Sequence, residues 1–214
     1  SSDCIHAGQK HGWISNSQYV AHLGSHKKFT EQMEHLIDSY THPQSTLVFI
    51  TDGAPWLRNW IEDAYPSGYS ILDYYHACEH LHCFSREHFI DKKKEKQWTA
   101  KQQQLLLESK VQEVIKNVQK LKSSKKEAQK LIEYYQANAD RMDYKAYQKI
   151  GCGIIGSGAI ESAHRKVIQK RMKQSGQRWS LEGAQNMLNL RVAKCNHQWQ
   201  KIVALTKTEF KKAA

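Results

Sequence analysis

Acidic residues stand directly after the two segments of the chain that most resemble strands. The apolar run at 46–51 ends at Asp52, and the shorter run at 69–72 ends at Asp73. A third acid, Glu161, lies in a basic, helix-like segment that follows a glycine-rich stretch. Carboxylates are hard oxygen ligands that suit Mg²⁺ or Mn²⁺. Two such ions can activate the attacking oxygen and stabilise the leaving oxygen of a phosphodiester, so these acids predict metal-dependent phosphoryl transfer.

Each of these acids also has a purely structural explanation. Asp52 and Asp73 need not do chemistry at the strand ends, since aspartate before glycine is common in turns and aspartate is also a good helix cap. A glutamate in the first turn of a helix, such as Glu161, complements the helix dipole. The residue types alone therefore leave both the catalytic and the structural interpretation open.

The two strand-like segments belong to one βαβ unit. A helix is expected over 54–65, with Pro55 tolerated in its first turn. Strand, helix and strand within 46–73 predict two parallel strands joined by a right-handed crossover. The carboxyl ends of such strands lie at one edge of the sheet, where ligands bind in open α/β folds. We therefore expect Asp52 and Asp73 to lie at that edge.

Helices are expected over most of the remaining chain. Apolar residues at helical spacing predict an amphipathic helix over 26–40 and a helical hairpin, rich in Lys and Gln, within 74–147. Another helix is expected to start near Ser157, and a last long helix, capped by Ser180, runs to Trp199. Residues 4–20 predict an edge strand followed by a loop. The fold class is thus α/β with a large all-helical insertion.

The pattern divides into four parts. Residues 1–77 are expected to form the first part of the core and 78–150 the helical insertion. Residues 151–200 are expected to supply the C-terminal helices that complete the core, and 201–214 a basic tail.

The charge balance points to a polyanionic partner. The chain has 32 Lys and Arg against 21 Asp and Glu, which gives a net charge of +11. No apolar run approaches the roughly 20 residues that span a bilayer, and no leader peptide is evident, so we expect DNA and no membrane. The five cysteines are odd in number and widely spaced, which is typical of a reducing cytoplasm.

Basic and aromatic residues near the third acid are the candidates for DNA contact. On the predicted helix that contains Glu161, basic residues lie opposite the apolar stripe, where phosphate contact and a solvated surface are equal alternatives. Two tryptophans could stack on an unpaired base or belong to the core. The predicted DNA-binding residues are Trp56, Arg165, Lys166, Lys170, Arg171, Lys173, Arg178 and Trp179.

A second metal site is an alternative on the segment that follows Asp73. His76, His80 and Cys83 stand at helical spacing, with Glu79 beside them. These residue types bind zinc, but structural zinc usually takes ligands from two elements. Histidines that hydrogen-bond to neighbouring side chains are the simpler explanation.

Four ordered blocks resemble the DDE transposases of bacterial insertion sequences, of the ISKra type. They are 52-DGAPWLRNW-60, 71-ILDYYHACEHL-81, 156-GSGAIESAHRKVI-168 and 171-RMKQSGQRWSLEGAQNMLNLR-191. The resemblance implies a ribonuclease H-like core whose helical insertion separates the second acid from the last.

Carried over by position, the resemblance makes Asp52 the second catalytic acid and Glu161 the last, both holding Mg²⁺ or Mn²⁺. Asp73 and His76 match a D-x-x-H motif of the related Mutator-like group and are expected to support the site. His164 and Arg165, one turn beyond Glu161, could hold its carboxylate.

The resemblance further implies DNA strand cleavage and transfer by a homo-oligomer on DNA ends, in the nucleoid of a bacterial cytoplasm. Whether guide or accessory nucleoprotein partners take part is left open. The first acid of the family has no counterpart here, and Asp3 is a weak substitute, so we expect that acid upstream of Ser1 and the chain to be a fragment or a remnant. The alternatives are a DNA-binding module without catalysis and a plain structural domain.

Overall fold

The structure is a computed structural model that describes most of the chain. The described residues are 2–6, 9–14, 16–121, 125–150, 153–156, 158, 164–169, 172 and 176–213. The chain forms two compact units, each assembled from separate segments. The first unit comprises 1–14 and 46–157, and the second comprises 15–45 and 158–214.

The chain begins with a β-hairpin. Strand β1 (Ser2–His6) pairs antiparallel with β2 (Gln9–Ile14), and the register shifts between Asp3 and Ile5. The prediction of one edge strand followed by a loop is therefore wrong for this segment. Pairing of the two strands satisfies backbone groups that a single edge strand would leave to solvent.

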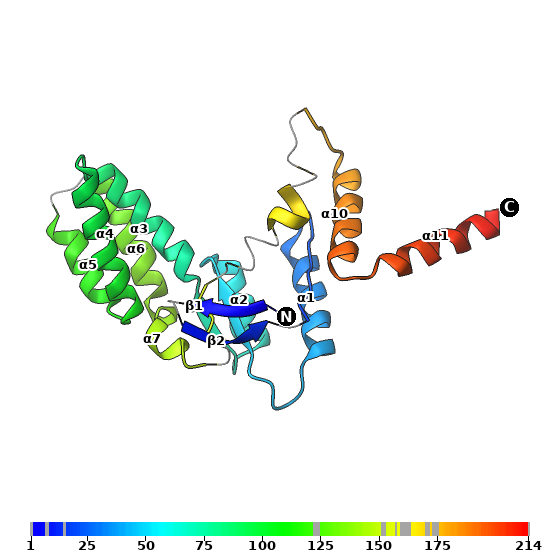
Figure 1. The fold of residues 1–214 in the computed structure, drawn as a ribbon, viewed down its shortest axis with the longest axis horizontal. Helices are drawn as coiled ribbons and strands as arrows, with labels where there is room; N and C mark the ends of the chain where they lie inside the picture. Colours follow the sequence, from blue (N-terminus) through cyan, green and yellow to red (C-terminus); the bar gives the residue numbers. More distant parts are fainter. Residues whose placement is uncertain are drawn as a thin grey trace. The chain divides into compact units, whose positions relative to one another are not determined.

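The predicted βαβ unit is confirmed. Strand β3 (Val48–Thr51) pairs in parallel with β4 (Tyr69–Leu72), and α2 (Pro55–Ala64) connects them (Figure 1). The ring of Phe49 on β3 lies 6.1 Å from Trp60 and 5.1 Å from Tyr65, measured between centroids. These aromatic contacts, in which Trp60 takes part, pack α2 against the sheet.

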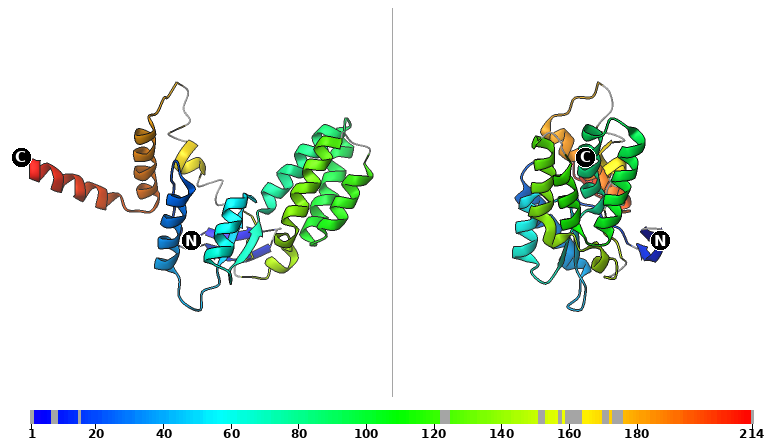
Figure 2. Two further views of the ribbon diagram at one scale, coloured as in Figure 1. Left: turned by 180° about the vertical axis from the view of Figure 1, so that it is seen from behind. Right: turned by 90° about the vertical axis from the view of Figure 1, so that its left-hand side faces the viewer.

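A group of helices follows β4 and packs side by side (Figures 1 and 2). The predicted helical hairpin is too simple, because a residue with positive φ, Ser109 (62°), breaks the long apolar stripe into two helices. The elements are α3 (Tyr74–His88), α4 (Lys92–Leu107), α5 (Val111–Lys120), α6 (Lys125–Asn138), the short 3₁₀ turn η1 (Ala139–Arg141) and α7 (Tyr144–Tyr147).

One apolar core joins this helical group to β4. Ile71 and Leu72 of β4 are fully buried with Leu81 of α3, Leu106 of α4 and Val114 of α5. Since α3 begins immediately after β4 and continues into the helical group, the predicted domain boundary at residue 78 lies inside a continuous helix. The strands and the predicted insertion therefore share their interior.

The regular elements described in the second unit are all helical. It contains α1 (His26–Tyr40), the π-helical turn η2 (Arg165–Gln169), α10 (Leu181–Cys195) and α11 (Trp199–Ala213). As predicted, Ser180 caps α10, because its hydroxyl accepts a hydrogen bond from the amide of Gly183. The prediction of a single long helix that runs to Trp199 is wrong.

The helix breaks because His197 adopts a positive φ of 59°, which ends α10 and lets α11 start anew. The side chain of Asn196, at the break, accepts from the amide of Tyr19 and donates to its carbonyl. The predicted basic tail at 201–214 begins inside α11.

The described chain is thus mostly helical, with a small parallel sheet of two strands. A ribonuclease H-like core stays a prediction. None of the helices in the described ranges is long and apolar enough to cross a membrane.

Candidate active site

The two aspartates that follow the strands lie at one edge of the parallel sheet. Thr51 and Leu72, the last residues of β3 and β4, are paired in register. Asp52 and Asp73 come directly after them, and the amide of Asp73 donates to the carbonyl of Thr51 at 2.8 Å. This is the edge at which the sequence predicted a ligand site.

Asp52 is exposed and lies in a tight turn between β3 and α2. Its Oδ1 accepts a hydrogen bond from the amide of Ala54 at 3.0 Å. Gly53 has a φ of 91°, and a Cβ at this position would lie 3.0 Å from Leu72 Cδ1 and 3.3 Å from the ring of Tyr134. Glycine is therefore required both by the backbone and by the close neighbours, and the turn presents the carboxylate to solvent.

Asp73 has a different environment, since the residue is only 4% exposed. Its Oδ1 accepts from the amides of Tyr75 at 2.8 Å and His76 at 3.3 Å, which caps α3. The segment 153–156 lies against it, and the amide of Tyr74 donates to the carbonyl of Ile155 at 2.9 Å. Capping accounts for the buried carboxylate, in keeping with a supporting role.

His76 and His80 extend one turn apart along α3 from the buried cap. Nδ1 of His76 lies 3.1 Å from a carboxylate oxygen of Glu79, and the two imidazole centroids are 5.0 Å apart. Nearby, Cys83 is exposed and contacts Arg86. Within the described part of the chain no three side chains are arranged to hold a metal ion, so the zinc alternative gains no support here.

Burial lowers the pKa of His80, and the neighbouring His76 lowers it further. The unfolded chain then binds a proton at His80 more readily than the folded chain, so folding is weakened as the pH falls through about 6.5, the pKa of an unperturbed histidine. We expect the melting temperature to drop less between pH 7.5 and 5.5 in His80→Gln than in the wild type. The exposed His82→Gln should retain the wild-type drop, and an equal drop in all three proteins would contradict the prediction.

Two residues that the sequence did not suggest reach the same edge from the helical group. The hydroxyl of Tyr134 on α6 donates to the carbonyl of Asp52 at 3.1 Å. Burial raises the pKa of Tyr134, and the charge of Asp52 adds to this, so the hydroxyl stays protonated and able to donate. Arg141, which is buried, donates to the hydroxyl of Thr51 at 3.4 Å.

A third unforeseen residue, Arg58 of α2, ties the site to the same helices. Its guanidinium forms a two-point ion pair with Asp140, with donor–acceptor distances of 3.4 and 2.8 Å. It also donates to the carbonyl of Ala137 at 3.1 Å and to Glu62 at 2.7 Å, and the bond to Glu62 raises the pKa of Arg58 most. Partners some 80 positions away along the chain leave no local sequence signal that would reveal them.

The structure describes only some of the remaining predicted site residues. Nδ1 of His164 lies 3.3 Å from the side-chain amide of Gln169, a neighbour on the same segment. Trp56, Arg178 and Trp179 are exposed. The expected meeting of Asp52 with Glu161 stays a prediction. Residues outside the described side chains are Glu161, Arg165, Lys166, Lys170, Arg171 and Lys173.

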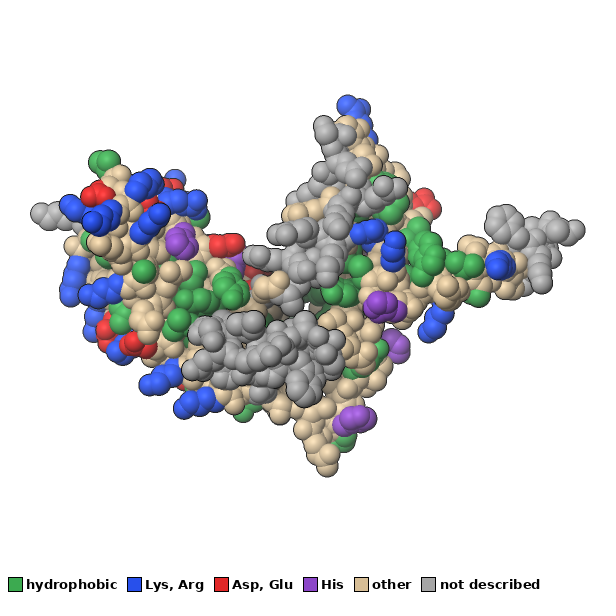
Figure 3. All heavy atoms as spheres, in the orientation of Figure 1, with side chains coloured by type: hydrophobic (Ala, Val, Ile, Leu, Met, Phe, Trp, Pro, Cys, Tyr) green, Lys and Arg blue, Asp and Glu red, His purple; other side chains and the backbone are tan. Residues whose placement is uncertain are grey.

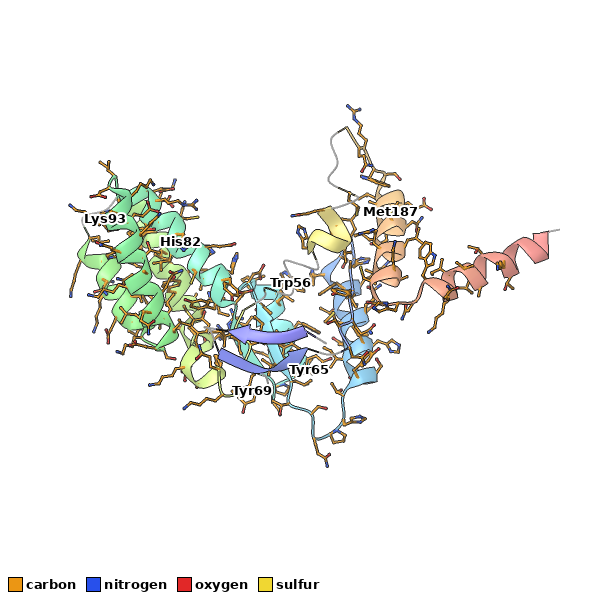
Figure 4. The ribbon with its side chains drawn as sticks, viewed as in Figure 1. Trp56, Tyr65, Tyr69, His82, Lys93 and Met187 are labelled. Atoms are coloured by element: carbon orange, nitrogen blue, oxygen red, sulfur yellow. The ribbon has the colours of Figure 1, made fainter. Side chains whose placement is uncertain are left out.

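The helical group is also a basic surface. Figure 3 shows Lys and Arg side chains spread over it, with fewer Asp and Glu among them. Lys93, labelled on α4 in Figure 4, is exposed, as are Lys94, Lys96 and Lys101 of the same helix. Figure 4 also labels Trp56, which lies on α2, the helix that follows Asp52 in the sequence.

Comparison with known proteins places the chain in a family but does not name an activity. No curated protein matches it, and no solved structure does. One family model, described as Uncharacterised protein family (UPF0236), matches residues 4–209 and so covers both units, including the edge that carries Asp52 and Asp73. The chain therefore belongs to the UPF0236 family.

Proposed function

We propose that this chain is the catalytic region of a transposase that resembles the DDE transposases of bacterial insertion sequences, and that it cleaves and joins DNA strands with Mg²⁺ or Mn²⁺. The observation that carries the proposal is the environment of Asp52. Its carboxylate is exposed at the carboxyl edge of a parallel sheet and is anchored through one oxygen to the Ala54 amide. A carboxylate that is accessible and held in one orientation is well suited to bind a hard cation.

In this proposal Asp52 and Glu161 hold the metal. A bound Mg²⁺ would supply charge stabilisation at the phosphate and a more acidic attacking water. Asp52 contributes a pre-oriented oxygen, since the Ala54 amide restricts rotation of its side chain. Asp73 and His76 support the site by fixing the start of α3, immediately after the sheet. The attacking oxygen would be water during cleavage and a 3′-hydroxyl during joining.

The charge of the chain supports DNA as the substrate. The net charge of +11 and the exposed lysines of α4 favour a polyanion. Exposed Arg178 and Trp179 stand together before α10, where one could bind phosphate and the other stack on a base. Such contacts would be largely independent of DNA sequence.

Titration calorimetry with Mn²⁺ tests whether the two acids share a metal. The wild type should release or absorb measurable heat on Mn²⁺ addition, and Glu161→Gln should weaken the affinity at least about tenfold, because a neutral amide replaces a charged ligand. Glu31→Gln makes the same chemical change at an exposed position of α1 and should bind like the wild type. A wild type without Mn²⁺ binding, or equal affinities in all three proteins, would refute the shared site.

A DNA-binding module without catalysis is the second candidate. It is favoured by the basic surface of the helical group. It predicts DNA binding that weakens steeply with salt and needs no divalent cation. Fluorescence anisotropy with labelled duplex DNA, with Mg²⁺ or with a chelator, distinguishes it from the transposase when combined with a cleavage assay.

A further inference from the structure

Tyr134 connects the helical group to the turn that carries Asp52. Its hydroxyl donates to the Asp52 carbonyl at 3.1 Å, although the two residues are 82 positions apart. The same tyrosine closes the space above Gly53, where an added Cβ would lie 3.3 Å from its ring carbon Cε2 and its hydroxyl. Tyr134 therefore both hydrogen-bonds to the carbonyl of Asp52 and occupies the space that a side chain at position 53 would need.

The ring of Tyr134 is itself held from α3. It stacks on His80 with a centroid distance of 4.0 Å and an interplanar angle of 25°. His76 lies at 6.3 Å in an edge-on arrangement. Because the ring of Tyr134 is held between its own helix α6 and α3, its hydroxyl is restricted to one position. The hydrogen bond to the Asp52 carbonyl therefore costs little additional side-chain entropy.

We propose that Tyr134 is a positioning residue: its hydroxyl fixes the Asp52 turn and so orients the carboxylate for the divalent cation. The catalytic use of this orientation rests on the proposed function, but the fixing of the turn does not. Tyr134 would act through Asp52 and would not itself touch metal or DNA. The helical group would thus help to build the site as well as cover the sheet.

The neighbouring residue provides a matched control. Tyr135 is fully buried, and its hydroxyl donates to the carbonyl of Ala77 on α3 at 2.9 Å. Tyr134→Phe and Tyr135→Phe therefore each remove one hydroxyl from α6, and each removes a hydrogen bond to a backbone carbonyl. The two variants differ in which carbonyl loses its donor: that of Asp52 or one within the helical core.

Amide hydrogen exchange tests the fixing of the turn. The amide of Ala54, which donates to Asp52 Oδ1, should exchange about fivefold faster in Tyr134→Phe, the change expected for the loss of one hydrogen bond that holds the turn. In Tyr135→Phe the exchange of this amide should be unchanged, while the protection of the α3 core amides falls. Equal exchange at Ala54 in the wild type and Tyr134→Phe would overturn the proposal.

Manganese titration tests the orientation of the carboxylate. Tyr134→Phe should weaken Mn²⁺ affinity about tenfold, as expected for loss of a group that orients a ligand, and nicking of plasmid DNA should recover at saturating Mn²⁺. Tyr135→Phe should bind Mn²⁺ like the wild type even if it melts at a lower temperature. Unaltered affinity in Tyr134→Phe would exclude the positioning role. If the wild type binds no Mn²⁺, the proposed function fails, and exchange at Ala54 alone decides whether Tyr134 fixes the turn.

Discussion

Asp52→Asn is expected to lower metal-dependent nicking of supercoiled plasmid about 1,000-fold, the loss that follows when several kcal/mol of transition-state stabilisation by a metal ligand are removed. Asparagine keeps an oxygen that can accept from the Ala54 amide, so the turn should survive. The free energy of unfolding should therefore change by less than about 0.5 kcal/mol, because Asp52 is exposed. The measurement is the initial rate of open-circle formation with Mg²⁺ and with Mn²⁺, using the protein as encoded in full.

The control for this variant is Asp63→Asn, an exposed position of α2 with the same change in charge. It should nick at the wild-type rate, which separates the loss of a ligand from a general change in DNA affinity. Nicking that persists in Asp52→Asn would end the assignment of Asp52 as a catalytic acid. DNA binding without metal-dependent nicking in the wild type would instead favour the non-catalytic module.

Asp73→Ala is expected to lower the free energy of unfolding by about 2 kcal/mol or more. The variant removes the oxygen that accepts from the amides of Tyr75 and His76, and these amides lie beside Asp73, a residue that is only 4% exposed. A lost cap costs about 1 kcal/mol, and a buried donor without a partner adds about 1–3 kcal/mol. Urea denaturation followed by circular dichroism measures the change.

Asp91 offers the matched comparison, since it caps α4 through the same pair of contacts, to Lys93 at 2.8 Å and Lys94 at 3.3 Å, but is exposed. Asp91→Ala should cost only about 1 kcal/mol, because water can replace the missing acceptor. Asp73→Asn should also cost little, since asparagine caps helices well. An equal cost at Asp73 and Asp91 would mean that burial of the first cap adds nothing to its importance.

Local sequence signals were sufficient for the sheet and its acidic edge. The apolar run before Asp52, the helix that starts at Pro55 and the second short strand before Asp73 are each encoded within a few residues. A parallel arrangement follows from their order, and it places both acids at one edge. The cap at Ser180 was equally local, because a cap depends on the next three residues.

The parts that could not be predicted depend on contacts between distant residues. In the sequence, nothing distinguishes Tyr134 from other residues of a predicted helix. Only the packing of α6 beside α3 brings its hydroxyl to the carbonyl of Asp52. The pairing of Arg58 with Asp140 is similarly distant in sequence. The break at His197 was missed because a single residue with positive φ leaves the apolar spacing of the two helices almost continuous.

The division of the chain into interleaved segments has a practical consequence for anyone dissecting it. Each unit draws on two stretches of the gene, and a fragment that starts at residue 158 would lack 15–45. Asn196 and Gln185 would then lose the backbone groups of Tyr19 and Leu23 that they bind. A version of the second unit that keeps these contacts consequently calls for a fused gene, with a short linker joining 15–45 to 158–214 in place of 46–157.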